Sequence, residues 1–254
     1  MLLEGKNALV YGAGSIGAAV ARSFAGEGAA VFVANRSGAR AEDVAAAIRA
    51  DGGTATAAAV DALEEAQVEE FVAGVADRAG SIDVSFNLIG IDDVQGVPLT
   101  EISYEDYAQP VIKAMRSTFL TARAAARRMA AGDGGAILAF GGSSAGADLR
   151  GHDFGGLLVA FEAVEAMRRQ FSIELGAKGV RFVTLRTGGI PETLPPELGG
   201  DREGIESGIV ESTLLGRAAS LEDVGAVAAF LASDRARTMT AATVNVSAGA
   251  LIDY

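Results

Sequence analysis

The chain has 254 residues, of which 50% are hydrophobic and 21% are charged, an ordinary globular composition with ample material for a core. Its formal net charge of −12 repels phosphate backbones and argues against nucleic-acid binding. Because the chain has no cysteine and one histidine, it excludes disulfide and thiolate chemistry, and a metal site made of several histidines is not available within it.

The N-terminal residues, MLLEGKNALVYGAG, run directly into a first predicted strand. They lack the basic segment, the long apolar run and the cleavage site of a signal peptide. No apolar run in the chain reaches the ~18 residues that a membrane span needs. We therefore expect a cytoplasmic protein with no membrane partner.

Short apolar segments alternate with helical patterns along the chain. The segments that predict strands are 7–11, 29–35, 54–60, 82–90, 135–142, 180–185 and 242–247. Between them apolar residues recur at helical spacing, and one long helix is expected from about Ser103 to Met129. Buried strands joined by helical crossovers predict a parallel sheet covered on both faces. The fold class is therefore α/β: a single domain over 1–254, with a Rossmann-like, doubly wound sheet of seven mostly parallel strands and helices on both faces.

The least regular stretch is TGGIPETLPPELGGDREGIESG, which follows the sixth predicted strand. It is rich in glycine and proline and is too long for a simple connection. We predict that residues 187–215 form a lid or substrate loop.

A G-x-G-x-x-G motif follows the first predicted strand and opens a helix, in YGAGSIGAAV. Gly12 permits a tight turn, Gly14 lets the backbone approach a pyrophosphate, and Gly17 lets helix and strand pack closely. The first N–H groups of the helix, at Ser15 and Ile16, are then free to face the anion. The motif predicts dinucleotide binding; the alternative is a glycine-rich turn in an inert sheet.

The second predicted strand ends at Asn35 and Arg36. A carboxylate at this place, about 20 residues after the glycines, would accept hydrogen bonds from the ribose hydroxyls of NAD. It is missing here, and a guanidinium suits a 2′-phosphate by charge and geometry. The pair predicts NADP as the cofactor, with NAD less favoured; the alternative is an exposed arginine on a surface turn.

Taken together, these features resemble the classical short-chain dehydrogenase/reductase family over essentially the whole chain. VDALEE is similar to the family segment whose aspartate contacts adenine, which implies this role for Asp61 and Ala62. NLIG resembles the family's N-N-A-G and keeps Asn87 and Gly90.

Two further stretches extend the resemblance. RTGGIPET stands in place of the family's P-G loop, which implies that Ile190 and Thr193 lie near the nicotinamide and phosphates. GRAASLEDVGAVAAFLASDRARTMTAATVNVSAG matches a typical family stretch, and Ser220 and Asp223 are expected to cap its helix. The glycine loop departs from the family's T-G-x-x-x-G-x-G, because it is one residue shorter and begins with Tyr11.

The larger departure concerns catalysis. In the family a tyrosine protonates the carbonyl oxygen as hydride arrives, and a lysine four residues later lowers the tyrosine pKa from ~10 and holds the nicotinamide ribose. Aligned on AVEAMRRQFSIELGAKGVR, the tyrosine position falls on Leu157 and the lysine position on Phe161. The family's helix asparagine falls on Ala114, and its serine on Ser144. One of four catalytic positions is kept.

Few side chains nearby are candidates to replace the missing acid. Ser144 is a candidate donor to a substrate oxygen, and His152 has an ordinary pKa suited to acid–base work; the alternatives are a serine that bonds nearby backbone and a solvated loop histidine. Ser143 is placed with Leu157 and Phe161 in the substrate pocket. Lys113 neighbours the lost asparagine position, but a lysine on a helix is usually solvated.

Three functions are compatible with these residues. The first is an NADP-dependent oxidoreductase with a substituted acid, acting on a carbonyl or alcohol of an apolar small molecule. The second is a non-redox isomerase, dehydratase or cyclase. The third is a non-catalytic NADP-binding sensor or the silent subunit of a mixed oligomer with an active relative.

The expected partners are a small-molecule substrate and further subunits. The predicted helix over 154–176 and the C-terminal segment resemble the surfaces through which the family forms dimers and tetramers. Extra apolar positions on that helix are Leu157, Leu158, Phe161, Val164 and Met167. A symmetric homo-oligomer is expected, most simply a homotetramer.

Overall fold

Seven parallel strands, in the order β3-β2-β1-β4-β5-β6-β7, form the sheet of this computed structural model, which describes residues 1–141, 153–195 and 202–252. The strands are β1 (Asn7–Tyr11), β2 (Ala30–Asn35), β3 (Thr54–Ala59), β4 (Val84–Asn87), β5 (Gly135–Gly141), β6 (Val180–Thr187) and β7 (Ala242–Val246). The predicted α/β, doubly wound fold is confirmed, and every strand pairing of the described sheet is parallel.

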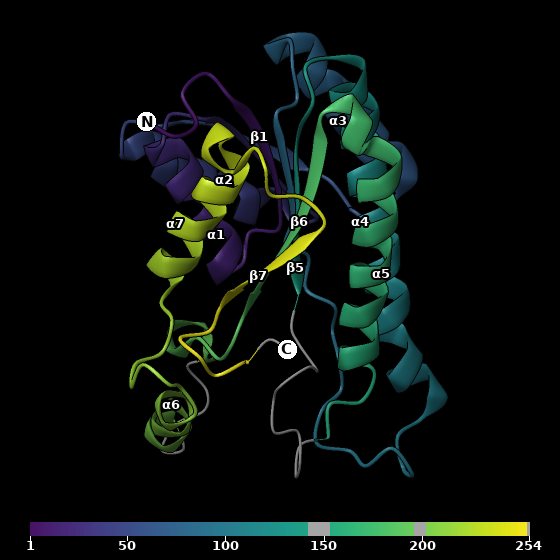
Figure 1. Cartoon of the computed structure of the whole chain (residues 1–254), viewed down its shortest axis with the longest axis vertical. Helices are drawn as coiled ribbons and strands as arrows, with labels where there is room; N and C mark the ends of the chain where they lie inside the picture. The colour runs from purple at the N-terminus through teal and green to yellow at the C-terminus, as the bar shows by residue number, and fades with distance from the viewer. Residues whose placement is uncertain (142–152, 196–201, 253–254) are drawn as a thin grey trace.

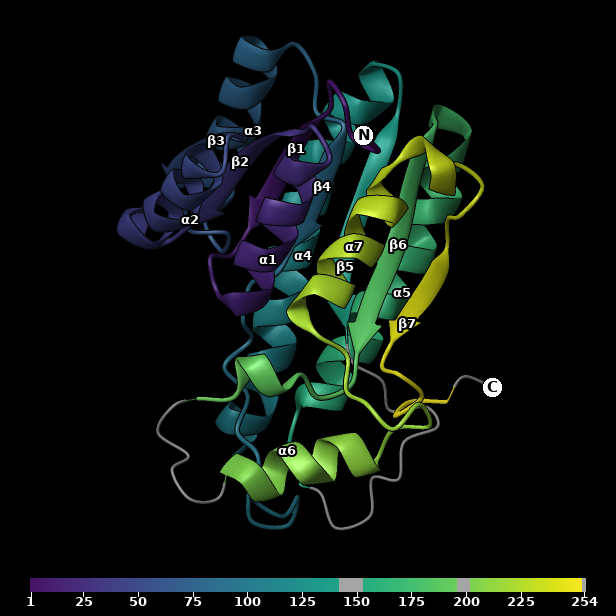
Figure 2. The ribbon, with the colours of Figure 1, turned by 90° about the vertical axis from the view of Figure 1, so that its left-hand side faces the viewer.

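Helices cover both faces of the sheet, as Figures 1 and 2 show. On one face lie α1 (Ser15–Gly26), α2 (Gly38–Ala50) and α7 (Leu221–Ala232). On the other lie α3 (Glu65–Ala79), α4 (Tyr104–Ala131) and α5 (Leu157–Leu175). A shorter helix, α6 (Arg202–Glu211), lies beyond the carboxyl ends of the strands (Figure 2). Among these described helices, none has both the length and the apolar character that a bilayer-crossing segment requires.

Each face has its own hydrophobic core. Phe24 of α1 and Val224 of α7 are fully buried against one face, together with Leu185 of β6. On the other face, Phe182 of β6 and Leu120 of α4 are buried with Val72 of α3. Phe182 and Leu185 are three positions apart on β6 and therefore point to opposite faces of the sheet, as the two-residue period of a strand requires.

The start of α7 is fixed by a capping box, as the sequence predicts. Ser220 Oγ accepts from the backbone N–H of Asp223 at 3.1 Å, and the Asp223 carboxylate accepts from the backbone N–H of Ser220 at 3.0 Å. The backbone hydrogen bond from Ser220, with smaller contributions from the Ser220 hydroxyl and Arg217, lowers the pKa of Asp223. The reciprocal pair orients α7 so that it packs alongside α1 (Figure 2).

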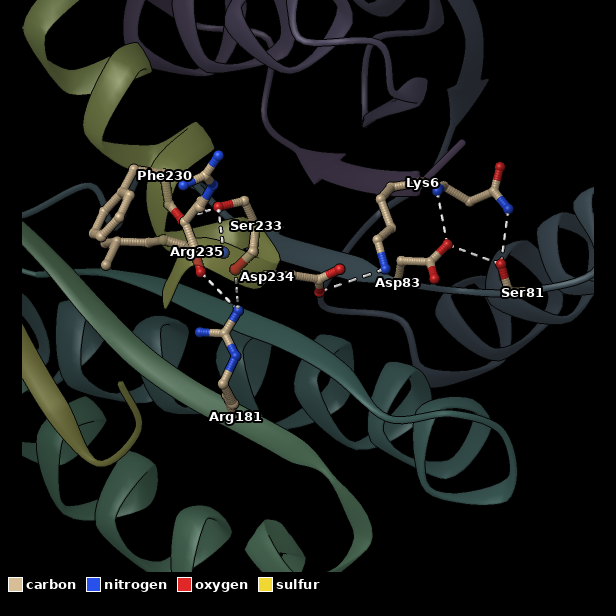
Figure 3. A network of polar contacts seen from close by, with 10 residues as sticks. Lys6, Ser81, Asp83, Arg181, Phe230, Ser233, Asp234 and Arg235 are labelled. Carbon is tan, nitrogen blue, oxygen red and sulfur yellow. Dashed lines mark hydrogen bonds and ion pairs between the residues drawn. The ribbon is translucent and has the colours of Figure 1, made fainter. Parts of the chain in front are cut away.

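Polar contacts hold the amino ends of the strands (Figure 3), at the end of the sheet opposite α6 (Figure 2). The Arg181 guanidinium donates to the carbonyls of Leu231 at 2.8 Å and Ser233 at 3.2 Å, and so closes the C-terminal end of α7. Asp83 accepts from the backbone N–H of Asn7 at 2.8 Å, which ties the start of β4 to the start of β1. These contacts anchor the amino ends of the sheet.

One buried polar group on β1 has no protein partner in the described part of the chain. The Tyr11 side chain is fully buried, and its hydroxyl oxygen contacts no hydrogen-bonding group there. Its ring meets Phe71 edge-on, with centroids 5.6 Å apart. Burial, with a smaller contribution from Glu69, raises the pKa of Tyr11 above its usual value. The ring therefore stabilises the core, while the desolvated hydroxyl opposes folding.

Tyr11→Phe is expected to raise the free energy of unfolding by about 1 kcal/mol at pH 7, because it removes a hydroxyl whose desolvation is uncompensated. Urea unfolding measures this. Above pH ~10 the unfolded chain ionises Tyr11 and the folded chain does not, so the parent loses a further ~1.4 kcal/mol per pH unit that the variant keeps. Tyr104→Phe, at a side chain that is 84% exposed, is the control. A destabilised Tyr11→Phe chain would show that the hydroxyl has a favourable partner.

Candidate functional site

A glycine turn joins β1 to α1 at the carboxyl edge of the sheet. Gly12 has φ +113°, and a Cβ there would lie 2.5 Å from the carbonyl oxygen of Leu88. A Cβ on Gly17 would lie 2.1 Å from the carbonyl oxygen of Gly12. Both positions therefore require glycine for backbone packing. A Cβ on Gly14 would meet nothing within 4 Å, so this position faces open space.

The N-terminus of α1 opens into that space. Gly14 is its N-cap, and no side chain caps this end. The first N–H groups of a helix have no acceptor within the helix, and the helix dipole makes this end favourable for an anion. The turn and the helix start together form a cradle that fits a phosphate group.

The cradle lies at one side of a cleft of about 460 Å³. Its walls come from residues that follow β1, β2, β3, β4 and β6, with one contribution from α4. Among the residues that the sequence predicts for cofactor binding, those that line the cleft are Gly12, Gly14, Ser15, Ile16, Gly17, Asn35, Arg36, Asp61, Ala62, Gly90 and Thr193. The structure therefore brings together residues that are up to 181 positions apart in the chain (Gly12 to Thr193).

The turn after β2 and the start of α2 supply two guanidinium groups. Arg36 lines the cleft as expected, and so does Arg40, which sequence analysis missed. Arg40 lies in the first turn of α2, whose N-cap Ser37 accepts from the Arg40 backbone N–H at 3.4 Å. Asn35 turns its side-chain amide to the carbonyl of Ser37 at 3.2 Å. The sequence feature that indicates Arg40 is its spacing of four residues from Arg36, because the two arginines flank the N-cap of α2.

The turn after β3 is held by its own hydrogen bonds. Asp61 Oδ1 accepts from the backbone N–H of Leu63 at 2.9 Å, and the Asp61 backbone N–H donates to Gln67 Oε1 at 2.9 Å. Ala62 is buried beside them. These bonds fix the turn after β3, which lines the cleft at the β3 edge of the sheet.

Two residues predicted for cofactor binding, Asn87 and Ile190, do not line this cleft. Asn87 points inward, where its Nδ2 donates to the hydroxyls of Ser117 and Thr118, each at 3.1 Å, and its Oδ1 accepts from the backbone N–H of Ile89 at 3.1 Å. Asn87 therefore fixes the shape of the turn that ends at Gly90.

Ile190 is buried in the core beneath α1 and α7. Its carbonyl accepts from the backbone N–H of Thr193 at 3.0 Å and from the Thr193 hydroxyl at 2.8 Å. These bonds close the short helix η2 (Pro191–Thr193). Ile190 thus holds Thr193 at the cleft.

The predicted catalytic segment is described only in part. Ser143, Ser144 and His152 lie outside the described residues. Leu157 is the first residue of α5, and Phe161 follows one turn later; both are half-buried, and neither lines the cleft.

The start of α5 lies directly against α4. A Cβ on Gly156, the N-cap of α5, would lie 1.9 Å from the carbonyl oxygen of Tyr107, so the two backbones touch here. Ala114 of α4 is 4% exposed. The sequence alignment expects Ala114, Leu157 and Phe161 at three catalytic positions, and none of these side chains can transfer a proton.

Lys113 is the largest departure from the expected site. The sequence suggests a solvated lysine, but its side chain is 14% exposed and lines the cleft. It forms an ion pair with Asp92, whose side chain is 75% exposed and which also lines the cleft. Among the lining residues, three cations (Arg36, Arg40 and Lys113) thus face two carboxylates, Asp61 and Asp92. Across residues 1–141, 153–195 and 202–252, no cluster of three or more metal-binding side chains occurs.

Comparison with known proteins places this geometry in context. A sequence profile described as enoyl-(acyl carrier protein) reductase matches residues 12–250. D-threitol dehydrogenase of Mycolicibacterium smegmatis is 32% identical over 254 residues, which cover 97% of this chain and 93% of that protein. L-rhamnose 1-dehydrogenase (NAD(P)(+)) of Azotobacter vinelandii is 33% identical over 264 residues, which cover 100% and 99%.

Solved structures show the same architecture. A short-chain type dehydrogenase/reductase from Mycobacterium ulcerans matches with a TM-score of 0.89 at 26% identity, over 98% of this chain and 91% of that chain. A short-chain dehydrogenase/reductase from Serratia marcescens matches with a TM-score of 0.85 at 25% identity, over 98% and 99%.

Proposed function

Because the chain belongs to the short-chain dehydrogenase/reductase family of oxidoreductases, we propose that it binds NADP(H) in the cleft and acts on a carbonyl or alcohol of a small molecule. When bound, the nicotinamide supplies the hydride chemistry. The observation that carries the proposal is the uncapped start of α1 at Gly14, together with the two guanidinium groups of Arg36 and Arg40 between β2 and the first turn of α2. The first fits a pyrophosphate, and the second fits a phosphate on the adenosine ribose.

NADP is favoured over NAD by the groups at the end of β2. No carboxylate stands at Asn35 to accept from free ribose hydroxyls. Arg36 and Arg40 both line the cleft, next to the N-terminus of α2. The relative from Azotobacter vinelandii is named for both cofactors, so family membership alone leaves the choice open.

The active site is proposed to be non-standard. Leu157 and Phe161 replace the acid and its helper, and Ser144 and His152 are the proposed donors to the substrate oxygen. Losing a positioned general acid lowers a rate by ~10²–10⁴. The apolar pair favours an apolar substrate, whereas the relatives named above are dehydrogenases of D-threitol and L-rhamnose. A substrate panel therefore needs both apolar ketones and polyols.

A second candidate function is a non-catalytic NADP-binding subunit. It is favoured by the three catalytic positions, Ala114, Leu157 and Phe161, that carry no group able to hold or move a proton. Tight NADP binding without nicotinamide turnover on the whole panel would select this function over the oxidoreductase.

Residues 187–215 are proposed to cover the substrate. The described parts of this segment are tied to the cleft through η2: Arg202 of α6 donates to the carbonyls of Pro191 and Leu194, each at 3.1 Å. Glu192 accepts from the backbone N–H of Leu221 at 3.2 Å. Thr193 of the same segment lines the cleft, so a displacement of α6 would be transmitted through η2 to the position of Thr193 in the proposed cofactor site.

A homo-oligomer, most simply a tetramer, is proposed from two unpartnered surfaces. An apolar groove of about 900 Å³ runs between α4 and α5; it includes Met167, one of the predicted apolar positions, and Phe119, which is 40% exposed. Val164, another of those positions, is buried in the core. The strand β7 is the sheet edge and pairs only with β6 in the described sheet. Apolar helix faces and open strand edges are both covered readily by a second copy.

The cofactor proposal predicts that NADP(H) binds more tightly than NAD(H) by calorimetric titration. Asn35→Asp should narrow or reverse the difference, since a carboxylate accepts from ribose hydroxyls and repels a 2′-phosphate. Arg40→Ala should weaken the binding of NADP(H) roughly tenfold or more, because a charged hydrogen bond is lost, and should leave the affinity for NAD(H) nearly unchanged. Equal affinity of the parent chain for both cofactors would contradict the assignment.

The catalytic proposal predicts slow reduction of ordinary ketones, with a pH profile that lacks a tyrosine titration. Leu157→Tyr with Phe161→Lys should raise turnover on some carbonyl substrate roughly ten- to a hundredfold, within the range for a general acid. Each single change should do less, because the two groups act as a unit. Leu157→Phe with Phe161→Met is the control for packing. Native rates typical of the family would show that the acid is not missing.

The assembly proposal predicts an oligomer by light scattering at micromolar concentration. Phe119→Glu should shift it toward smaller species, because a carboxylate in the α4–α5 groove opposes burial. Ile173→Glu is the matched control, since this α5 side chain is 83% exposed and lies outside the groove. A parent chain that is only monomeric at this concentration would refute the proposal.

A further inference from the structure

Lys113 reaches the cleft from the side opposite the glycine turn. The turn leads into α1, which packs on one face of the sheet, whereas Lys113 belongs to α4, which packs on the other (Figure 1). Both line the same cleft at the carboxyl edge of the strands. A dinucleotide whose pyrophosphate rests on the start of α1 therefore has Lys113 across from it.

The burial of Lys113 argues against an ordinary surface lysine. Its side chain is 14% exposed, although the residue lies on a helix with solvent-facing positions. Its partner Asp92 is 75% exposed, in a loop after β4, with φ +54° in the left-handed region. An exposed carboxylate of this kind contributes little net attraction, because water solvates it well. The Lys113 side chain is thus mostly buried, whereas its counter-ion Asp92 is mostly exposed to solvent.

The distribution of charge shows what the ammonium is suited to bind. Arg36 directly follows β2, and Arg40 lies in the first turn of α2, the helix after it. Apart from these two, Lys113 is the one Lys or Arg among the described residues that line the cleft. Away from Arg36 and Arg40, the described lining of the cleft therefore has a single cation, Lys113.

We infer that Lys113 is a phosphate-binding residue of the cleft, paired with Asp92 in the free protein and with the dinucleotide's pyrophosphate in the complex. The inference rests on the proposed function. Lys113 is a binding residue here and takes no part in proton transfer.

Calorimetric titration with NADP⁺ separates a phosphate-binding role of Lys113 from a structural one. If Lys113 binds phosphate, substitution of Lys113 lowers the affinity for NADP⁺, whereas substitution of Asp92 does not. Lys113→Met should weaken binding roughly ten- to a hundredfold, the effect of losing a charged hydrogen bond, and Lys113→Arg should restore most of it. Asp92→Asn should bind at least as tightly as the parent, since it removes a competing carboxylate. If the ion pair only fixed the loop, Asp92→Asn would weaken binding as much as Lys113→Met, and the inference would be wrong. Lys6→Met, at the far end of the sheet, is the matched control.

A second measurement on the native sequence covers the case in which Lys113→Met does not fold. The chain has three lysines, Lys6, Lys113 and Lys178. Reductive methylation with ¹³C keeps their charge and gives each an NMR signal, and the Lys113→Arg variant assigns the one of interest. NADP⁺ should shift the Lys113 signal and leave the other two in place. A stationary Lys113 signal in protein saturated with NADP⁺ overturns the inference alone, whereas a parent chain that binds neither NADP(H) nor NAD(H) overturns the proposed function with it.

Discussion

The contact between two backbones at the glycine turn governs the geometry of the cleft. A single methyl group on Gly17 would overlap the carbonyl of Gly12, and one on Gly12 would overlap the carbonyl of Leu88. The end of β1, the start of α1 and the turn after β4 thus approach as closely as main chains can. The remaining walls, after β2 and β3 and on α4, are placed relative to this point by the parallel register of the sheet.

Much of the fold could be predicted from the sequence, because buried parallel strands appear as continuous apolar runs. The first strand is predicted with its observed bounds, and most others differ by one or two residues. The fourth is predicted over 82–90 but ends at Asn87, since Leu88 and Ile89 are apolar yet belong to the cleft wall. Apolar character marks burial and cannot tell a strand from the turn that follows it.

The site was less accessible to sequence reasoning, because it depends on where side chains point. Gly12 and Gly17 have a backbone role, because a Cβ at either position would overlap a backbone carbonyl oxygen; the expected approach of Gly14 to a pyrophosphate stays a prediction. The rotation of α4 about its axis decides which of its side chains meet Asn87 of β4 and which enter the cleft. It turns Ser117 toward Asn87 and Lys113 into the cleft. Helical periodicity shows which apolar positions face the core, but it does not show which polar side chains beside that face are enclosed. A lysine in such a place is therefore predicted to be solvated.

The order of the strands also has a consequence for synthesis on the ribosome. Sheet assembly begins with β1, and each later strand pairs with one made before it: β2 with β1, β3 with β2, β4 with β1, and so on to β7. From β2 onward, each strand therefore has a partner already made when it leaves the ribosome, although the growing sheet keeps an open edge until the next strand is added. The exception is α1, whose apolar side waits for α7 until about two hundred residues later. A nascent chain should thus leave the apolar side of α1 uncovered until α7 has been made, so α1 is the segment that needs protection for longest.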